Sequence, residues 1–197
     1  MSKNKEITAK RLAMDAVLIA LYVALSMLAI VLGGFKLTFE HLPVIICAVM
    51  FGPVDAMLVG GLGELINQML TFGFTPTTIL WMAPAVFCGL ATGLGAKLSG
   101  DNLGLNALLN RKVPVAFFAL CVVVALGCSL INTFTLYVDS MMFGYYSYAM
   151  VFGVLWLRLA TGASSSVLMA VASKPVVLAL KKSKLILEVY NERKRSD

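Results

Sequence analysis

The 197-residue chain has few charged residues and a single histidine. Charged side chains make up 13% of the chain, whereas typical soluble domains contain about 25%. Apolar residues make up 60%, and the mean hydropathy is +0.90. One small globule cannot bury so much apolar surface, and a disordered chain would be far less hydrophobic. The composition therefore excludes a water-soluble monomer and favours a small polytopic membrane protein.

The sequence motifs of several enzyme classes are also missing. The chain has no G-x-x-x-x-G-K-[ST] phosphate loop and no G-x-S-x-G turn, and one histidine is too few for an H-E-x-x-H site. Enzymes that act on membrane lipids usually need several clustered carboxylates or histidines, and this chain has too few. We therefore predict that the protein is not an enzyme and that it holds no cofactor of its own.

The cysteines give no sign of a metal or redox site. No two of them form a C-x-x-C pair, none adjoins His41 in the sequence, and all lie inside apolar runs: Cys47, Cys88, Cys121 and Cys128. Because a free cysteine behaves as a small buried hydrophobe, we predict that all four are packing residues and that the protein has no metal site.

The apolar runs predict an all-α fold that crosses the membrane repeatedly. A helix needs about 20 apolar residues to cross a hydrocarbon core of about 30 Å. Turn signals separate six runs, which predict a single membrane domain with six spans at about residues 12–32, 42–52, 54–72, 77–97, 113–138 and 149–180. The first run is too long for the apolar part of a signal peptide, so we expect it to be retained. The glycine-rich segment Gly33–Thr38 and the segment Asp139–Tyr148 are predicted to be loops.

The distribution of basic residues predicts the orientation of this bundle. Fourteen of the sixteen lysines and arginines lie in the N-terminal segment, between spans four and five, or in and after the last part of span six. Lys36 is on the opposite side, and Arg158 lies within span six. By the positive-inside rule, both termini are cytoplasmic. The net charge of +6 then indicates a membrane surface as the partner, and no nucleic acid.

Several polar side chains are predicted at a similar depth in the outer halves of the spans. Ionisable residues inside a bilayer are costly, so Glu64 and Arg158 are candidates for function. Asn67 and Gln68 follow Glu64 at i+3 and i+4 and share its helix face. Asn132 lies in span five, and Thr78 and Trp81 lie near the outer start of span four. One interpretation is a Glu64–Arg158 ion pair that holds the bundle together. The other is a pocket open to the outside.

Aromatic residues near the predicted outer loops allow two interpretations. Tryptophan and tyrosine favour the membrane interface, so these residues can form an interfacial belt. Alternatively they form a lid that stacks on a flat ring of a ligand. The residues concerned are Phe35, Phe39, Phe72, Phe74, Trp81, Phe143, Tyr145, Tyr146 and Tyr148.

Small residues recur every four positions in three spans. Ala85, Gly89 and Gly93 form one such stripe, and Gly162, Ser166 and Ala170 form another. Small residues let helices approach closely in lipid, so we predict that these two stripes pack inside the bundle. A third stripe, Ala16, Ala20 and Ala24, begins near the cytoplasmic end of span one.

A second motif lies in the stretch from Phe35 to Leu65, which contains Leu42-Pro43, Phe51-Gly52-Pro53 and Gly63-Glu64-Leu65. Together with the stripe Ala16, Ala20 and Ala24, it carries a resemblance over residues 7–180 to a known family, the substrate-binding S components of energy-coupling factor (ECF) vitamin transporters. The stretch looks like the folate-type branch of that family, and Thr71–Pro76 leads into the next helix as in that branch.

The resemblance implies a function and partners. A vitamin, with folate as the first candidate, would bind under the outer loops. The S component would then topple in the membrane and release it inward, driven by two cytoplasmic ATPases through a transmembrane T component. The alanine stripe would dock on the T component, and only the partners would use ATP. Expected ligand-contacting residues are Lys36, Glu64, Asn67, Gln68, Phe74, Thr78, Trp81, Asn132, Tyr145, Tyr146 and Arg158.

Other substrates and other functions stay open from the sequence. Another vitamin or a corrinoid would also suit the family. An autonomous ion-coupled secondary transporter or channel, in which Glu64 carries a proton, is the main alternative function. A membrane-integral enzyme or assembly factor is a third.

Overall fold

The computed structural model describes residues 2–28, 30–32, 35–98 and 115–181, with side chains for residues 9–28, 38–98 and 115–180. Within these ranges every regular element is a helix, apart from one short hairpin. In order, the elements are α1 (Ser2–Met27), β1 (Ile30–Leu32), β2 (Phe35–Leu37), α2 (Leu42–Met50), α3 (Pro53–Phe72), α4 (Thr78–Leu98), α6 (Val115–Met142), the π-helical turn η2 (Ala149–Gly153) and α7 (Leu155–Lys181).

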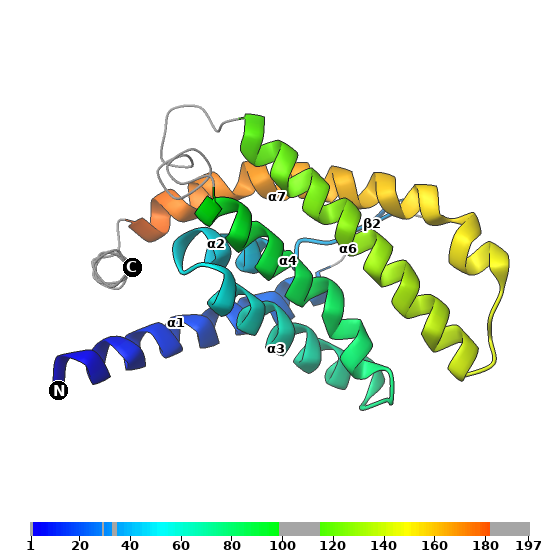
Figure 1. Ribbon diagram of the computed structural model, residues 1–197, viewed down its shortest axis with the longest axis horizontal. Helices are drawn as coiled ribbons and strands as arrows, with labels where there is room; N and C mark the ends of the chain where they lie inside the picture. The colour runs from blue at the N-terminus through cyan, green and yellow to red at the C-terminus, as the bar shows by residue number, and fades with distance from the viewer. Residues whose placement is uncertain (1, 29, 33–34, 99–114, 182–197) are drawn as a thin grey trace.

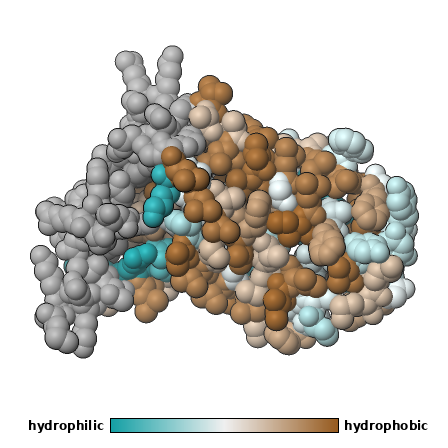
Figure 2. Space-filling model, viewed as in Figure 1, coloured by the Kyte–Doolittle hydropathy of each residue, from teal (hydrophilic) through white to brown (hydrophobic). Residues whose placement is uncertain are grey.

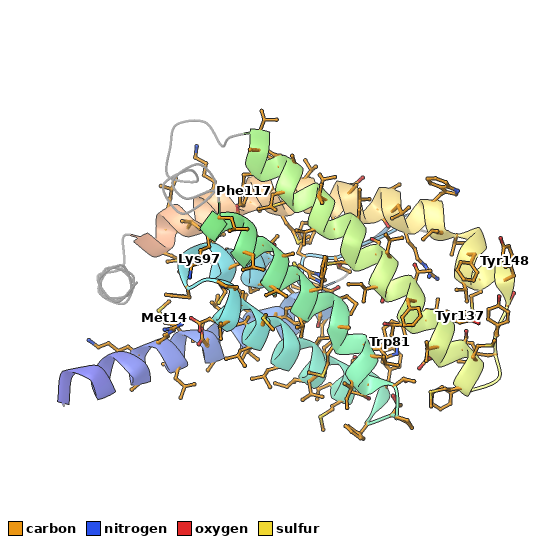
Figure 3. The ribbon with its side chains drawn as sticks, viewed as in Figure 1. Met14, Trp81, Lys97, Phe117, Tyr137 and Tyr148 are labelled. Atoms are coloured by element: carbon orange, nitrogen blue, oxygen red, sulfur yellow. The ribbon has the colours of Figure 1, made fainter. Side chains whose placement is uncertain are left out.

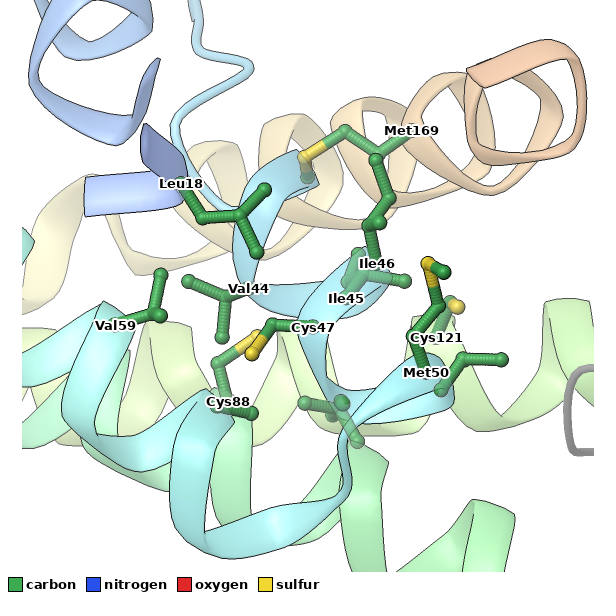
Figure 4. Close-up of a cluster of buried hydrophobic side chains, with 14 of the residues drawn as sticks. Leu18, Val44, Ile45, Ile46, Cys47, Met50, Val59, Cys88, Cys121 and Met169 are labelled. Carbon is green, nitrogen blue, oxygen red and sulfur yellow. The ribbon is translucent and has the colours of Figure 1, made fainter. Parts of the chain in front are cut away.

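The short helix α2 forms the centre of the bundle (Figure 1). It contacts α1, α3, α4 and α7, and every residue from Pro43 to Met50 is buried. Figure 4 shows its side chains packed against Leu18, Val59, Cys88 and Met169, which come from α1, α3, α4 and α7. At 1.5 Å per residue, nine residues span about 14 Å. Helix α2 alone is shorter than a hydrocarbon core of about 30 Å, and the predicted span at residues 42–52 stays a prediction.

Three of the described helical segments are long and apolar enough to cross a membrane: Thr78–Leu98, Val115–Met142 and Ala149–Leu180. Helix α3 is less apolar, but it exposes Val54, Leu58, Leu62 and Ile66 at four-residue spacing, which suits a lipid-facing stripe. Figure 2 shows apolar residues over most of the middle of one face, with paler residues gathered at one end. These features agree with a membrane protein, and the count of six spans stays a prediction.

The ends of the bundle differ in composition. The start of α1 and the end of α7 lie at the same end of the molecule (Figure 1). Lys97 also lies at this end, whereas Trp81, Tyr137 and Tyr148 lie at the other (Figure 3). The arrangement agrees with the predicted cytoplasmic and outer ends, although the side of the membrane on which the termini lie stays a prediction. Below, the aromatic end is called the outer end.

Two predicted loops are partly regular structure. In the first, β1 and β2 form an antiparallel hairpin in which Val31 faces Lys36 across the strands; every other element of the described chain is helical, in agreement with the predicted all-α class. In the second, α6 continues to Met142, four residues past its predicted end. Asp139 is thus a helical residue, and its carboxylate has hydrogen-bond partners that let it lie 9% exposed.

Helices α3 and α4 pack closely because small residues face each other. A Cβ atom added to Gly93 would lie 2.4 Å from Cα of Pro53, and one added to Gly89 would lie 2.5 Å from the backbone of Ala56. In α7, a Cβ on Gly162 would lie 2.6 Å from the hydroxyl of Ser129 on α6. The two stripes predicted to pack inside the bundle do so.

Candidate functional site

A cavity of about 1340 Å³ lies among α1, α3, α4, α6 and α7, beside the segment that joins β2 to α2. Its walls run from Phe143 and Tyr145 at the outer end to Thr92 and Cys121 deeper in the bundle. Pockets for small organic molecules usually measure about 300–1,000 Å³. This cavity therefore has room for a ligand larger than most drugs.

Glu64 supplies a buried carboxylate to the wall of the cavity. Its Oε2 accepts hydrogen bonds from the hydroxyl of Tyr22 at 2.9 Å and from Nδ2 of Asn67 at 3.2 Å, and its Oε1 accepts one from Nε2 of Gln68 at 2.7 Å. Ser26 on α1 in turn donates to Oδ1 of Asn67 at 2.8 Å. The predicted shared face of Glu64, Asn67 and Gln68 is confirmed, and the network fixes the carboxylate in one orientation.

Arg158 supplies a guanidinium group to the same cavity. Its Nη2 donates to the backbone oxygen of Met150 at 3.0 Å, while its buried Nη1 has no hydrogen-bond partner among the described residues. Within the described part of the chain, Glu64 and Arg158 do not form the ion pair considered from the sequence. Arg158 lines the cavity, so a small rotation of its side chain would make the unpaired nitrogen available to an anionic group of a ligand.

Asp139 ties together the outer end of the cavity. It accepts hydrogen bonds from the hydroxyl groups of Thr77 and Tyr145 and from Nε1 of Trp81, the last at 3.4 Å. The hydrogen bond to this carboxylate raises the pKa of the Tyr145 phenol to about 12. The phenol therefore stays protonated at neutral pH and keeps donating to Asp139. Two aromatic residues at the mouth of the cavity are thus held by one carboxylate.

The structure brings together most of the residues that the sequence nominated as ligand contacts. The cavity is lined by Glu64, Asn67, Gln68, Trp81, Asn132, Tyr145 and Arg158.

Four nominated residues do not contribute a described side chain to the cavity wall. Phe74 is 72% exposed at the turn between α3 and α4. The hydroxyl of Thr78 accepts a hydrogen bond from the backbone N–H of Thr75 at 2.9 Å, which is a role at the start of α4. Tyr146 packs edge-on against Tyr137, with ring centroids 5.6 Å apart. Lys36 lies in β2, and its side chain is outside the described part of the chain.

Among the polar residues that line the cavity, sequence reasoning missed Tyr22, Glu40, His41 and Asp139. Tyr22 lies on the same face of α1 as the buried residues Asp15 and Leu18. The helical spacing of these three residues could have predicted the face of α1 that packs inward. Asp139 was assigned to a loop because α6 was expected to end before it. Glu40 and His41 precede α2, and only the tertiary fold places them at the cavity.

The three small-residue stripes differ in exposure. Those on α4 and α7 lie against neighbouring helices. Ala16, Ala20 and Ala24 on α1 are all exposed, while Asp15, Leu18 and Tyr22 on the opposite face are buried. The stripe on α1 therefore forms a smooth surface that the described part of the chain leaves uncovered.

The comparison with protein families agrees with this combination of helices and cavity. The model of the family described as "ECF transporter, substrate-specific component" matches residues 10–177. No curated protein matches the chain.

Proposed function

The chain belongs to the substrate-specific components of ECF transporters, and from this premise we propose that it captures a vitamin on the outer side of the cell membrane and delivers it inward with its partner subunits. The observation that carries the proposal is the cavity of about 1340 Å³. It holds a fixed carboxylate at Glu64 and an unpaired guanidinium nitrogen at Arg158. A ligand with a donor-rich ring and a separate anionic group would match both.

Folate is the first ligand that we propose. Its pterin ring carries N–H groups that can donate hydrogen bonds to a carboxylate such as that of Glu64. Asn67 and Gln68, which bond to Glu64, add amide groups to this part of the cavity. The glutamate carboxylates of folate suit the free Nη1 of Arg158. Trp81 and Tyr145 line the outer part of the cavity and offer rings for stacking. Another vitamin or a corrinoid would have to meet the same arrangement of charges.

Partner subunits would supply the energy for delivery, because only they would use ATP. We propose that Ala16, Ala20 and Ala24 dock on a transmembrane T component, which two cytoplasmic ATPases drive. The exposure of all three residues supports this role, since small residues allow a partner helix to approach closely. Both termini would lie in the cytoplasm, on the side of the ATPases.

Intrinsic fluorescence can test the capture step, because the chain has only two tryptophans. Trp81 lines the cavity, and Trp156 is 80% exposed on α7. A Trp156→Phe variant leaves Trp81 as the sole reporter, and a bound vitamin should quench its emission in a saturable way. The matched Trp81→Phe variant should bind the same ligand with little change in emission. Failure of a folded Trp156→Phe protein to respond to any member of a vitamin panel would contradict the proposal.

Uptake into proteoliposomes separates this function from an autonomous transporter. The chain alone should bind the vitamin without accumulating it. Addition of the T component, both ATPases and ATP should produce sustained uptake. Accumulation by the lone chain, driven by an ion gradient, would favour the ion-coupled secondary transporter instead.

A further inference from the structure

Three potential metal ligands that are far apart in the sequence meet beside the cavity. His41 precedes α2, Cys88 lies on α4 and Cys128 lies on α6. The ligand atoms of these side chains, a ring nitrogen and two sulfurs, all lie within 4.8 Å of one another. All three residues line the cavity. No short motif contains all three residues, so sequence reasoning did not group them.

The donor set suits a thiophilic metal ion. Zinc is bound by cysteine sulfur at about 2.3 Å and by histidine nitrogen at about 2.0–2.1 Å, usually in a tetrahedron. Ligand atoms in such a site lie about 3.3–3.8 Å apart, by geometry from those bond lengths. The ligand atoms would therefore have to approach one another by about 1.5 Å at most. Rotation of a thiol or an imidazole can supply a movement of that size.

The surroundings of the two ring nitrogens of His41 suit a metal ligand. Its Nε2 is buried and has no hydrogen-bond partner among the described residues. Its Nδ1 faces the carboxylate of Glu40, with Nδ1 and Oε1 3.7 Å apart. Metal-binding histidines commonly direct the second ring nitrogen at a carboxylate, which sets the tautomer and the ring orientation. An unpaired buried nitrogen is costly, and a bound metal ion would remove that cost.

We propose that His41, Cys88 and Cys128 bind one Zn²⁺ ion. Both thiols lose their protons on binding, so one Zn²⁺ enters and two protons leave. The two thiolates then neutralise the charge of the ion, which suits a site among membrane helices. In the structure Cys128 donates to the backbone oxygen of Pro84 at 3.3 Å, and metal binding replaces this weak hydrogen bond. Three protein ligands leave a fourth position for water or for a donor atom of a molecule in the cavity.

Metal titration of the full-length protein tests the proposal without any vitamin. Any polyhistidine tag must be removed, because its histidines would bind Zn²⁺ themselves, whereas the chain has only one histidine, His41. The reduced protein should bind one equivalent of Zn²⁺ and release two protons. Co²⁺ as a spectroscopic probe should give the thiolate-to-cobalt charge-transfer band and the intense visible bands of a tetrahedral site.

Three variants and one control locate the site. Cys88→Ala, Cys128→Ala and His41→Gln should each weaken Zn²⁺ binding by at least about 100-fold. Cys121→Ala is the matched control, because Cys121 is also buried and lines the same cavity but lies outside the group of three. It should bind Zn²⁺ as the wild type does. Circular dichroism shows whether each variant has folded.

Thermal unfolding gives a second measurement that does not depend on the variants. Zn²⁺ should raise the unfolding midpoint of the wild-type protein in a concentration-dependent way. Absence of one-equivalent binding by the folded wild type, or binding that Cys88→Ala and Cys128→Ala leave unchanged, would overturn the proposal. Either result leaves the vitamin-binding function untouched, since the fluorescence experiment measures that separately and without added metal.

Discussion

Replacement of Arg158 by methionine tests how the cavity holds an anionic ligand. Methionine has a similar length and leaves the wall filled, but it removes the guanidinium group. The free protein loses only the hydrogen bond from Nη2 to the backbone of Met150 at 3.0 Å, which is worth about 1 kcal/mol. The fold should therefore survive, and the effect on ligand affinity can be measured directly.

The expected loss of affinity follows from the unpaired nitrogen. Nη1 has no hydrogen-bond partner in the described part of the chain, so it can bond to a ligand carboxylate without breaking a bond within the protein. Hydrogen bonds to charged groups contribute about 1.5–3 kcal/mol. At about 1.4 kcal/mol per factor of ten, Arg158→Met should raise the Kd for folate by about 10- to 150-fold. Arg158→Lys, which keeps the charge and loses the planar fork, should have an intermediate Kd.

Ligand chemistry supplies the control for this prediction. Folate dimethyl ester has nearly the shape of folate but lacks both glutamate charges. The wild-type protein should prefer folate to the ester by the same factor that Arg158→Met loses, and the variant should bind the two ligands about equally. The assay is quenching of Trp81 emission in the Trp156→Phe background. An unchanged preference for folate in the Arg158→Met variant would refute the proposed contact.

Two further predictions concern the helix surfaces. Ala20→Trp should abolish uptake by the complete transporter and leave vitamin binding unchanged, because Ala20 is exposed. The control Val123→Trp, at an exposed site of α6, should support normal uptake. A parallel loss of vitamin binding in Ala20→Trp would show that the stripe packs internally. Gly93→Ala should lower the free energy of unfolding by about 1–3 kcal/mol, because the new Cβ would lie 2.4 Å from Cα of Pro53. The control Gly153→Ala, whose Cβ would lie 3.7 Å from its nearest neighbour, should be nearly neutral. Equal thermal unfolding midpoints for the two variants would contradict the packing argument.

The helices of the fold were predictable where an apolar run had clear ends. The predicted span at residues 77–97 corresponds to α4 (Thr78–Leu98), and the segment Ala149–Leu180 agrees with the last predicted span. Helix α2 (Leu42–Met50) is shorter than a typical span, and hydropathy alone does not distinguish burial in lipid from burial in protein. Its residues are apolar because they are enclosed by α1, α3, α4 and α7. Strands β1 and β2 are too short to show an alternating pattern.

The site was predictable for residues that share one helix face. Spacing at i+3 and i+4 placed Asn67 and Gln68 beside Glu64, and both donate to its carboxylate. The convergence of His41 with Cys88 and Cys128 has no such signal, because it depends on how α2 packs against α4 and how α4 packs against α6. The role of Asp139 depends in the same way on the contact of α6 with the start of α4.

Helix α1 connects the two surfaces on which the proposed function depends. On its buried face, Tyr22 donates to Glu64 and Ser26 donates to Asn67. On its exposed face lie Ala20 and Ala24, which we propose as part of the docking stripe. Both hydrogen bonds join α1 to α3, so a shift of α1 against α3 by about 1 Å would lengthen them beyond the usual range. A partner that moves α1 would thereby loosen the carboxylate that orients the ligand, and docking and release would be coupled through one helix.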